Sequence, residues 1–240
     1  MKPPFHLNRP RPMERKRTTQ SLFSQQHADA KGKRMSYGDP EVWVLDDDPA
    51  VLRALERLLR DHGYRIQTHI NPDSFFSAGP PPVPTCLILD YQLGNGVTGV
   101  EVYAELKRRA WNLPTVFVTA YWSVPLVVQV MRKGADGFLT KPYNSDELLE
   151  AVIQALERAR AQQREELLEA DARARAESLT PRELEIVSLI AAGFLNKEIA
   201  DKLDIALVTV KVHRGHAMHK LGAGNSAELG RIIERAGFIS

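Results

Sequence analysis

Two groups of carboxylates stand directly after two apolar runs of the sequence. Asp46, Asp47 and Asp48 follow the run VWVL, and Asp90 follows the run CLIL. If both runs are neighbouring strands of a parallel sheet, their carboxyl ends meet at the edge where such sheets bind ligands. Carboxylate oxygens suit a hard divalent cation such as Mg²⁺ beside a carboxylate nucleophile. The pattern therefore predicts an aspartate that accepts a phosphoryl group.

The four carboxylates divide into three predicted roles. Asp90 is the candidate nucleophile, because a carboxylate can accept a phosphoryl group as a mixed anhydride when nearby charge neutralises the phosphate. Asp46 and Asp47 are candidates for holding Mg²⁺. Asp48 precedes a proline at the start of a helical pattern, so we expect it to act only as the N-cap of that helix.

Two further polar residues stand at the ends of later apolar runs. Thr119 offers a hydroxyl to a bound phosphoryl group, and Lys141 offers a compact cation to the same group. Alone, such residues are most often a strand end and a surface lysine. Their placement after the fourth and fifth predicted strands, with Asp90 after the third, favours one shared site.

An alternation of apolar runs and helical periodicity begins at residue 41. It predicts an α/β fold, in which helices cover both faces of a five-stranded parallel sheet. The predicted strands are residues 42–45, 65–70, the segment ending at Asp90, 115–119 and 137–140. We divide this part of the chain into a phosphoacceptor domain at 39–160, a linker helix at 161–177 and a second, all-α domain at 178–240.

The linker belongs to a helical pattern that runs without a breaker from Asp146 to about Ala176. The apolar stripe of this pattern thins after Ala159, and Asp171 and Arg175 offer an i,i+4 ion pair. We interpret the segment as a long helix that could pair with a second copy of itself. A frayed, charged tether is the alternative, because isolated helices are marginally stable in water.

The pattern of apolar and capping residues at 178–240 predicts four helices. Thr180 and Glu183 form a capping box at the start of the first, and Asn196 is placed to cap a short second helix. A tight turn joins that helix to a third at 208–221. Two short helices joined in this way are typical of a helix-turn-helix domain.

The third of these helices carries positive charge and no acidic residue. Its basic residues are Lys211, Arg214 and Lys220, and it holds three histidines as well. Positive charge on the helix that would enter the major groove predicts binding to double-stranded DNA. A metal site at the histidines is disfavoured, because no cysteine or acidic residue accompanies them.

The first 38 residues hold nine Lys/Arg and two Asp/Glu and show no apolar periodicity. We expect a disordered basic tail, with Met13 or Met35 as alternative starts of the protein. The single Cys86 excludes an intrachain disulfide, and no apolar stretch approaches the roughly 20 residues that cross a bilayer. These features predict a cytoplasmic protein that does not associate with a membrane.

Residues 40 to about 157 resemble the receiver domain of two-component response regulators, through Asp46-Asp47, Asp90, Thr119-Ala120 and Lys141-Pro142. The resemblance implies a flavodoxin-like fold and phosphorylation of Asp90 by a sensor histidine kinase. It also implies that the Lys141-Pro142 peptide is cis.

The same resemblance implies a metal site and a switch. Mg²⁺ would be bound by Asp47, Asp90 and the backbone carbonyl of Gln92. Phe138 would be a switch aromatic that turns inward when Thr119 moves toward the phosphoryl group.

The loop after Asp90 departs from the family pattern. Residues 91–99 read YQLGNGVTG, where the family usually has Pro after the Leu and a slightly shorter loop. The glycines at 94 and 96 free the backbone, so loop geometry and phosphoryl lifetime are open, whereas Asp90 stays the expected acceptor.

Residues 179 to 238 resemble the LuxR-type helix-turn-helix, through LTPRE at 179–183, NKEIA at 196–200 and TVKVH at 209–213. Together the two resemblances imply a response regulator of the NarL/FixJ class. The implied DNA-binding residues are Asn196, Lys197, Thr209, Lys211, Val212, His213, Arg214 and Lys220.

These predictions describe a phosphorylation-controlled transcription regulator and not an enzyme. Phosphoryl transfer to Asp90 would expose a dimer surface and pair two helix-turn-helix units on DNA, with RNA polymerase as a further partner. The alternatives are a phosphatase or phosphotransferase, a module that binds protein instead of DNA, and a regulator that works without phosphorylation.

Overall fold

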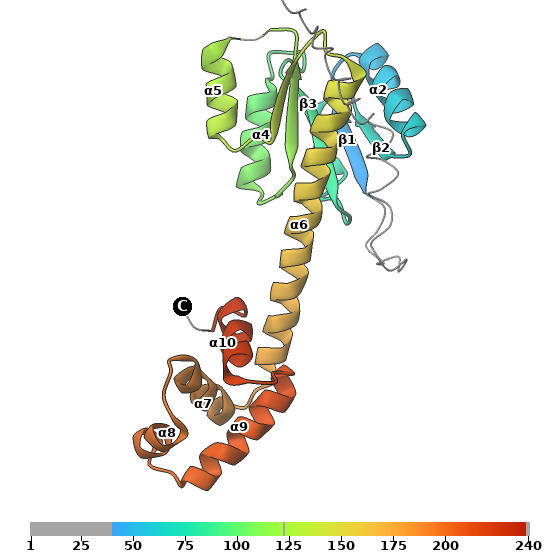
Figure 1. Cartoon of the computed structure of the whole chain (residues 1–240). Coiled ribbons are helices and arrows are strands. Elements are labelled where there is room, and N and C mark those ends of the chain that lie inside the picture. The colour runs from blue at the N-terminus through green and yellow to red at the C-terminus, as the bar shows by residue number, and fades with distance from the viewer. Residues whose placement is uncertain (1–39, 122, 239–240) are drawn as a thin grey trace, which may run out of the picture.

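The computed structural model describes residues 40–121 and 123–238. A parallel sheet flanked by helices forms one domain, a group of short helices forms a second, and the long helix α6 joins them (Figure 1). The tail predicted at residues 1–38 lies outside the described residues. Within the described part of the chain, every helix is too short or too polar to cross a bilayer.

The sheet domain contains β1 (Glu41–Leu45), β2 (Arg65–His69), β3 (Thr85–Asp90), β4 (Thr115–Thr119) and β5 (Gly137–Thr140). The strands are parallel and lie in the order β2-β1-β3-β4-β5. Its helices are α2 (Pro49–Asp61), α3 (Pro72–Ser77), α4 (Gly99–Arg108), α5 (Val124–Arg132) and the first half of α6 (Ser145–Glu177). The predicted α/β fold is confirmed.

Alternate residues of the central strands enter two separate apolar clusters. Val42 and Val44 of β1 pack with α2 and α6, whereas Trp43 and Leu45 pack with α3, α4 and α5. This alternation is the two-residue repeat of a strand whose two faces are both covered. The buried strands therefore end together at one exposed edge, which we call the carboxyl edge.

The helices α2 to α6 start at the carboxyl edge, each with a side chain that accepts from one of its first N–H groups. Asp48 is the N-cap of α2 and accepts a hydrogen bond of 2.7 Å from Ala50 N, which confirms its predicted role. Asn144 and Glu147 form the capping box that starts α6. These caps hold the loops that follow β1 and β5.

Helix α6 is continuous over 33 residues and belongs to both domains. Leu148 is buried in the sheet domain, and Ala172 and Ala176 are buried in the core of the helical domain. The predicted ion pair between Asp171 and Arg175 is formed at 2.7 Å. The segment is therefore a helix and not a frayed tether, and its last turns are part of the second core.

The helical domain contains α7 (Pro181–Ala191), α8 (Asn196–Leu203), α9 (Leu207–Leu221) and α10 (Ser226–Arg235). Asp204 ends α8 in the left-handed conformation, with φ of 50°, and this sharp turn leads into α9. The four-helix domain with its helix-turn-helix is confirmed.

The predicted cap of α8 is wrong. Asn196 is the first residue of the helix, and Leu195 occupies the N-cap position with its N–H donating to Glu198 at 2.7 Å. The side-chain oxygen of Asn196 instead accepts a hydrogen bond of 3.1 Å from Arg214. A tertiary contact with α9 has replaced the local cap.

Candidate functional site

The acidic pocket forms where β1 and β3 end side by side. The register of the two strands pairs Leu45 with Leu89, so the residues that follow, Asp46 and Asp90, are also neighbours. Carboxylate oxygens of Asp46, Asp47 and Asp90 all lie within 4.8 Å of one another. The structure thus brings together the three carboxylates that the sequence predicted.

Lys141 enters this pocket from the end of β5. Its ammonium donates to Oδ2 of Asp46 at 2.9 Å and to Oδ2 of Asp90 at 3.2 Å. Burial lowers the pKa of Lys141, but the hydrogen bonds and charges of the two carboxylates outweigh it, so the net shift is upward. The lysine is therefore a fixed positive charge beside the predicted phosphoacceptor.

Asp46 is the most buried of the three carboxylates, with 3% of its surface exposed. One of its oxygens accepts from Lys141, and the other accepts from the backbone N–H of Asp48 at 2.9 Å. Asp47 is exposed and Asp90 is half-buried, and burial raises the pKa of Asp90 more than Lys141 lowers it. The two less buried carboxylates are the ones that a cation could reach directly.

This donor set fits a hard divalent cation, because it consists of clustered carboxylate oxygens with one side open to solvent. Gln92, which was predicted to add its backbone carbonyl, lies in the loop after β3 and forms an isolated bridge with Thr98. Its part in binding a cation stays a prediction.

Two glycines let the loop after β3 approach the carboxylates. Gly94 has φ of +69°, and a Cβ placed on it would lie 2.9 Å from Oδ2 of Asp47. A Cβ on Gly99 would overlap the backbone carbonyl of Asp90, and the Gly99 N–H donates to Tyr91 O at 2.7 Å. From the sequence we expected Gly94 and Gly96 only to free the backbone of this loop. In the structure, Gly94 and Gly99 allow this loop to pack closely against Asp47 and Asp90.

The two predicted switch residues lie beside this pocket on β4 and β5. Thr119 is buried, and its hydroxyl donates to Tyr121 O at 3.1 Å while accepting from Tyr121 N at 3.0 Å. Phe138 is partly buried against the cluster beneath α3, α4 and α5. The Lys141-Pro142 peptide is cis, as the resemblance implied.

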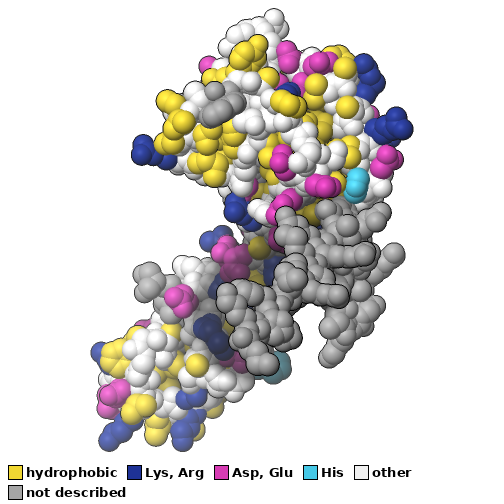
Figure 2. All heavy atoms as spheres, turned by 45° about the horizontal axis from the view of Figure 1, so that its top comes forward, with side chains coloured by type: hydrophobic (Ala, Val, Ile, Leu, Met, Phe, Trp, Pro, Cys, Tyr) yellow, Lys and Arg dark blue, Asp and Glu magenta, His cyan; other side chains and the backbone are white. Residues whose placement is uncertain are grey.

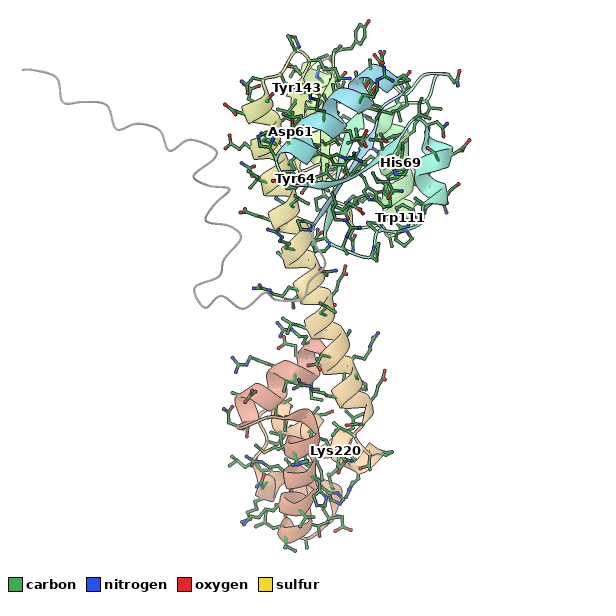
Figure 3. The ribbon with its side chains drawn as sticks, turned by 90° about the vertical axis from the view of Figure 1, so that its right-hand side faces the viewer. Asp61, Tyr64, His69, Trp111, Tyr143 and Lys220 are labelled. Atoms are coloured by element: carbon green, nitrogen blue, oxygen red, sulfur yellow. The ribbon has the colours of Figure 1, made fainter. Side chains whose placement is uncertain are left out.

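Tyr143 is a neighbour of the site that was not identified from the sequence. It lies two residues after Lys141 and packs against the core beneath α2 and α6. Burial raises its pKa, and the charges of Lys141, Asp46 and Asp90 all act on its phenol. Figure 3 places Tyr143 at the end of the sheet domain that is farthest from the helical domain.

The predicted DNA-binding face is formed by α8 and the first half of α9. Lys197, Lys211 and Val212 are exposed, and Thr209 and His213 are partly exposed. Val210, Ala217 and Leu221 of α9 are fully buried. The exposed residues of α9 therefore lie on the side that is free to meet a ligand, and Lys197 adds an exposed cation from α8.

Three of the predicted DNA contacts, Asn196, Arg214 and Lys220, have partners within the helical domain. Arg214 donates to Asn196 Oδ1 at 3.1 Å and to Ser226 Oγ at 3.0 Å, which joins α8, α9 and α10. Lys220 donates to Glu183 Oε2 at 2.6 Å, and Glu183 is only 3% exposed. The sequence placed Glu183 in a capping box but did not indicate its second partner.

Comparisons with known proteins match both domains. The family model described as response regulator receiver domain matches residues 42–153, and the model described as bacterial regulatory proteins, luxR family, matches residues 177–233. Nodulation protein W of Bradyrhizobium diazoefficiens is 36% identical over 196 residues, which is 82% of this chain and 86% of that protein. The chain is a response regulator of the NarL/FixJ class.

Other response regulators match over a similar share of the chain. The transcriptional regulatory protein FixJ of Bradyrhizobium diazoefficiens is 32% identical over 199 residues, covering 83% of this chain and 97% of FixJ. The solved structure of the response regulator StyR is 35% identical with a TM-score of 0.73, covering 82% of this chain and 99% of StyR. This response regulator is therefore a transcriptional regulator, whose receiver domain implies a histidine kinase partner and whose LuxR-type domain implies DNA binding.

Proposed function

We propose that Asp90 accepts a phosphoryl group from a histidine kinase and that this modification controls binding to double-stranded DNA. The observation that carries the proposal is the position of the Lys141 ammonium. It lies 3.2 Å from Oδ2 of Asp90, in the pocket that Asp46 and Asp47 also line. An oxygen of Asp90 attacks phosphorus, the bond between phosphorus and the kinase histidine breaks, and the histidine nitrogen leaves with the electron pair.

The charge of the transferred group is neutralised from two sides. Asp47, Asp90 and the backbone carbonyl of Gln92 would hold Mg²⁺, which would supply positive charge at the phosphoryl oxygens. Asp46 orients Lys141, which contacts the phosphoryl group through its ammonium. The chain acts here as acceptor and switch and not as a catalyst for an outside substrate.

Once phosphorylated, the receiver domain would rearrange around β4 and β5. The Thr119 hydroxyl exchanges its bonds with Tyr121 for a bond to the phosphoryl group, and Phe138 moves into the space this opens. Phosphate is the stronger acceptor, because its oxygens are charged.

A route from β5 to the helical domain is supported by two ion pairs. The Asp136 carboxylate, next to β5, accepts from Thr115 N and from Arg158 of α6, both at 2.7 Å. Farther along α6, Glu165 accepts from Arg235 of α10 at 3.1 Å. We propose that α6 carries the displacement of β5 to the helical domain as a rigid rod.

Self-association of the phosphorylated protein is proposed to use α5. Val124, Val128 and Met131 of this helix are 67%, 41% and 46% exposed. Figure 2 shows hydrophobic side chains gathered on this part of the receiver domain. A homodimer would place two helix-turn-helix units on two half-sites, which raises affinity because one such unit makes few phosphate contacts.

In the proposed DNA complex, Asn196, Lys197 and Thr209 position phosphates, and Lys211, Val212 and His213 lie in the major groove. Arg214 positions α8 against α9, and we do not retain Lys220 among the contacts because Glu183 binds it. The cytoplasm is the proposed compartment, where the bound regulator would recruit or exclude RNA polymerase.

The test compares Asp90→Asn with the control Asp61→Asn, which changes an exposed carboxylate at the end of α2. Each protein is treated with a small acyl phosphate and Mg²⁺, and phosphorylation, dimer formation and DNA affinity are measured. We expect the control to gain one phosphoryl group, dimerise and bind DNA more tightly, and Asp90→Asn to do none of these. An unchanged response of Asp90→Asn, or sustained turnover of the acyl phosphate without labelling, would overturn the proposal.

A further inference from the structure

A cavity of about 350 Å³ lies at the edge of the sheet opposite the acidic pocket, where α6 leaves the receiver domain. Its walls come from the proline-rich loop before β3, the loop between α4 and β4, and α6. Figure 3 shows Trp111, one of the lining residues, at the end of the receiver domain that is nearest to the helical domain. The proposed phosphorylation site does not use this cavity.

The lining combines apolar walls with hydrogen-bond acceptors. Pro81, Pro84 and Trp111 supply apolar surface. Oε1 of Gln163 is buried and has no hydrogen-bond partner among the described residues. A buried acceptor left unpaired is unfavourable, so this oxygen favours a ligand that brings a donor.

The charges at the cavity favour a cation. Glu166 of α6 lines it and forms no ion pair with a described residue. Arg109 also lines it, and its guanidinium donates to Glu105 at 2.6 Å, a carboxylate shared with Arg108, and lies over the ring of Phe76, so these partners hold it in place. An aliphatic stem that ends in a cationic donor, as in Lys or Arg, matches the apolar wall, the Gln163 acceptor and the Glu166 carboxylate.

The chain itself carries such side chains within reach of the cavity. The N–H of Glu41, the first residue of β1, donates to the carbonyl of Pro84 at 3.0 Å, and Pro84 lines the cavity. The described chain therefore begins beside the cavity wall. Lys31, Lys33 and Arg34 precede Glu41 by ten residues or fewer, and even seven extended residues can span about 23–25 Å.

We propose that this cavity binds a basic side chain from residues 31–34 of the same chain, which braces α6 where it leaves the receiver domain. The bound cation would join the Gln163 amide and the Glu166 carboxylate of α6 to the proline-rich loop. A braced α6 transmits displacement between the domains with less bending.

The experiment measures amide hydrogen exchange of residues 158–168 in the full-length protein. Lys31, Lys33 and Arg34 are changed together to Gln, and the matched control changes Arg15, Lys16 and Arg17 to Gln. Both variants lose the same charge outside the described domains, so neither is expected to disturb folding. A third variant, Glu166→Gln, removes the carboxylate from the cavity itself.

We expect exchange in this segment to rise roughly fivefold in the 31/33/34 variant and in Glu166→Gln, and to stay unchanged in the control. Equal exchange in both triple variants would indicate a general charge effect and overturn the proposal. So would unchanged exchange in the 31/33/34 variant, or a dependence on protein concentration, which would place a second copy in the cavity.

Discussion

The ammonium of Lys220 lies 2.6 Å from Oε2 of Glu183, a carboxylate that the helical domain buries between α7 and α9. The same carboxylate accepts a hydrogen bond of 2.8 Å from Thr180 N at the start of α7. A buried carboxylate needs these partners, because an unpaired buried charge is strongly unfavourable. The basic residues of α9 therefore divide into Lys220 and Arg214, which bind partners within the domain, and Lys211, which is exposed.

Replacing these lysines should separate the two roles. We expect Lys220→Met to lower the free energy of unfolding by about 1–3 kcal/mol, because Glu183 loses a charged partner. Lys211→Met should leave stability unchanged and reduce the salt dependence of DNA binding by about one unit of slope. Urea unfolding and DNA titrations at several salt concentrations check both. If Lys220→Met reduced the salt dependence of DNA binding and left the free energy of unfolding unchanged, Lys220 would act on DNA and not in the fold.

The stability of the helical domain should fall in strong acid. Burial raises the pKa of Glu183, but hydrogen bonds from Lys220 and Thr180 outweigh it and hold the pKa at about 2, below the ordinary 4.5. A carboxyl whose pKa is lower when folded stabilises the protein above 4.5 and loses this contribution as the pH falls toward 2. Unfolding measured from pH 6 to pH 2 should show this loss in the wild type and not in Glu183→Gln.

His69 should add a second pH dependence at higher pH. It is 4% exposed between Trp43 and Phe75, and burial lowers its pKa although a backbone hydrogen bond at Ser74 partly opposes this. The unfolded chain therefore binds a proton more readily, so stability falls as the pH drops through 6.5. We expect His69→Phe to lose less stability than the wild type between pH 7.5 and pH 5.

The exposed His216→Gln is the matched control for this measurement. It removes a histidine of α9 and leaves the contacts of His69 with Trp43 and Phe75 in place. A His69→Phe variant with an unchanged slope between pH 7.5 and pH 5 would show that His69 does not titrate in this way.

Gly94 and Gly96 offer a paired test of the cation site. Both have positive φ, but only at Gly94 would an added Cβ approach Asp47, whereas Gly96 has open space around it. Alanine at either position should cost about 1 kcal/mol of stability through backbone strain. Mg²⁺ titration followed by calorimetry should show weaker binding for Gly94→Ala alone. Equal loss of Mg²⁺ affinity in both would point to the loop backbone rather than to Asp47.

Arg158→Gln should uncouple the two domains. Asp136 keeps its bond to Thr115 N in this variant but loses its link to α6. We expect normal phosphorylation of Asp90, but a gain in DNA affinity on phosphorylation about two- to fivefold smaller, in keeping with a partly exposed ion pair. Arg164→Gln, an exposed change on the same helix, is the control and should behave as the wild type. A full gain in Arg158→Gln would show that the signal takes another route.

The fold could be predicted from the sequence because its determinants are local. Strands followed from apolar runs, and the N-cap role of Asp48 followed from the proline after it. Asp90, Asp46 and Lys141 could be assigned to one site because parallel strands bring their carboxyl ends to one edge. Each of these inferences uses a residue and its near neighbours, or a rule that holds for all sheets of this kind.

Other features depend on contacts between residues far apart in the chain, and a local pattern does not show them. Asn196 looked like a cap, but its oxygen is bound by Arg214, eighteen residues later. Lys220 is predicted to contact DNA, and the structure adds a partner on α7, Glu183, which the sequence did not indicate.

The sequence by itself thus determined the class of fold, the gathering of carboxylates at one edge of the sheet and the helix-turn-helix, because hydrophobic periodicity and strand ends are properties of short segments. Only the tertiary structure decided which charges are free to act. The fold places Glu183 beside Lys220, Gly94 beside Asp47, and a cavity where α6 leaves the receiver domain. The free energy of a charge depends on what surrounds it in space, and residues far apart in the chain supply those surroundings.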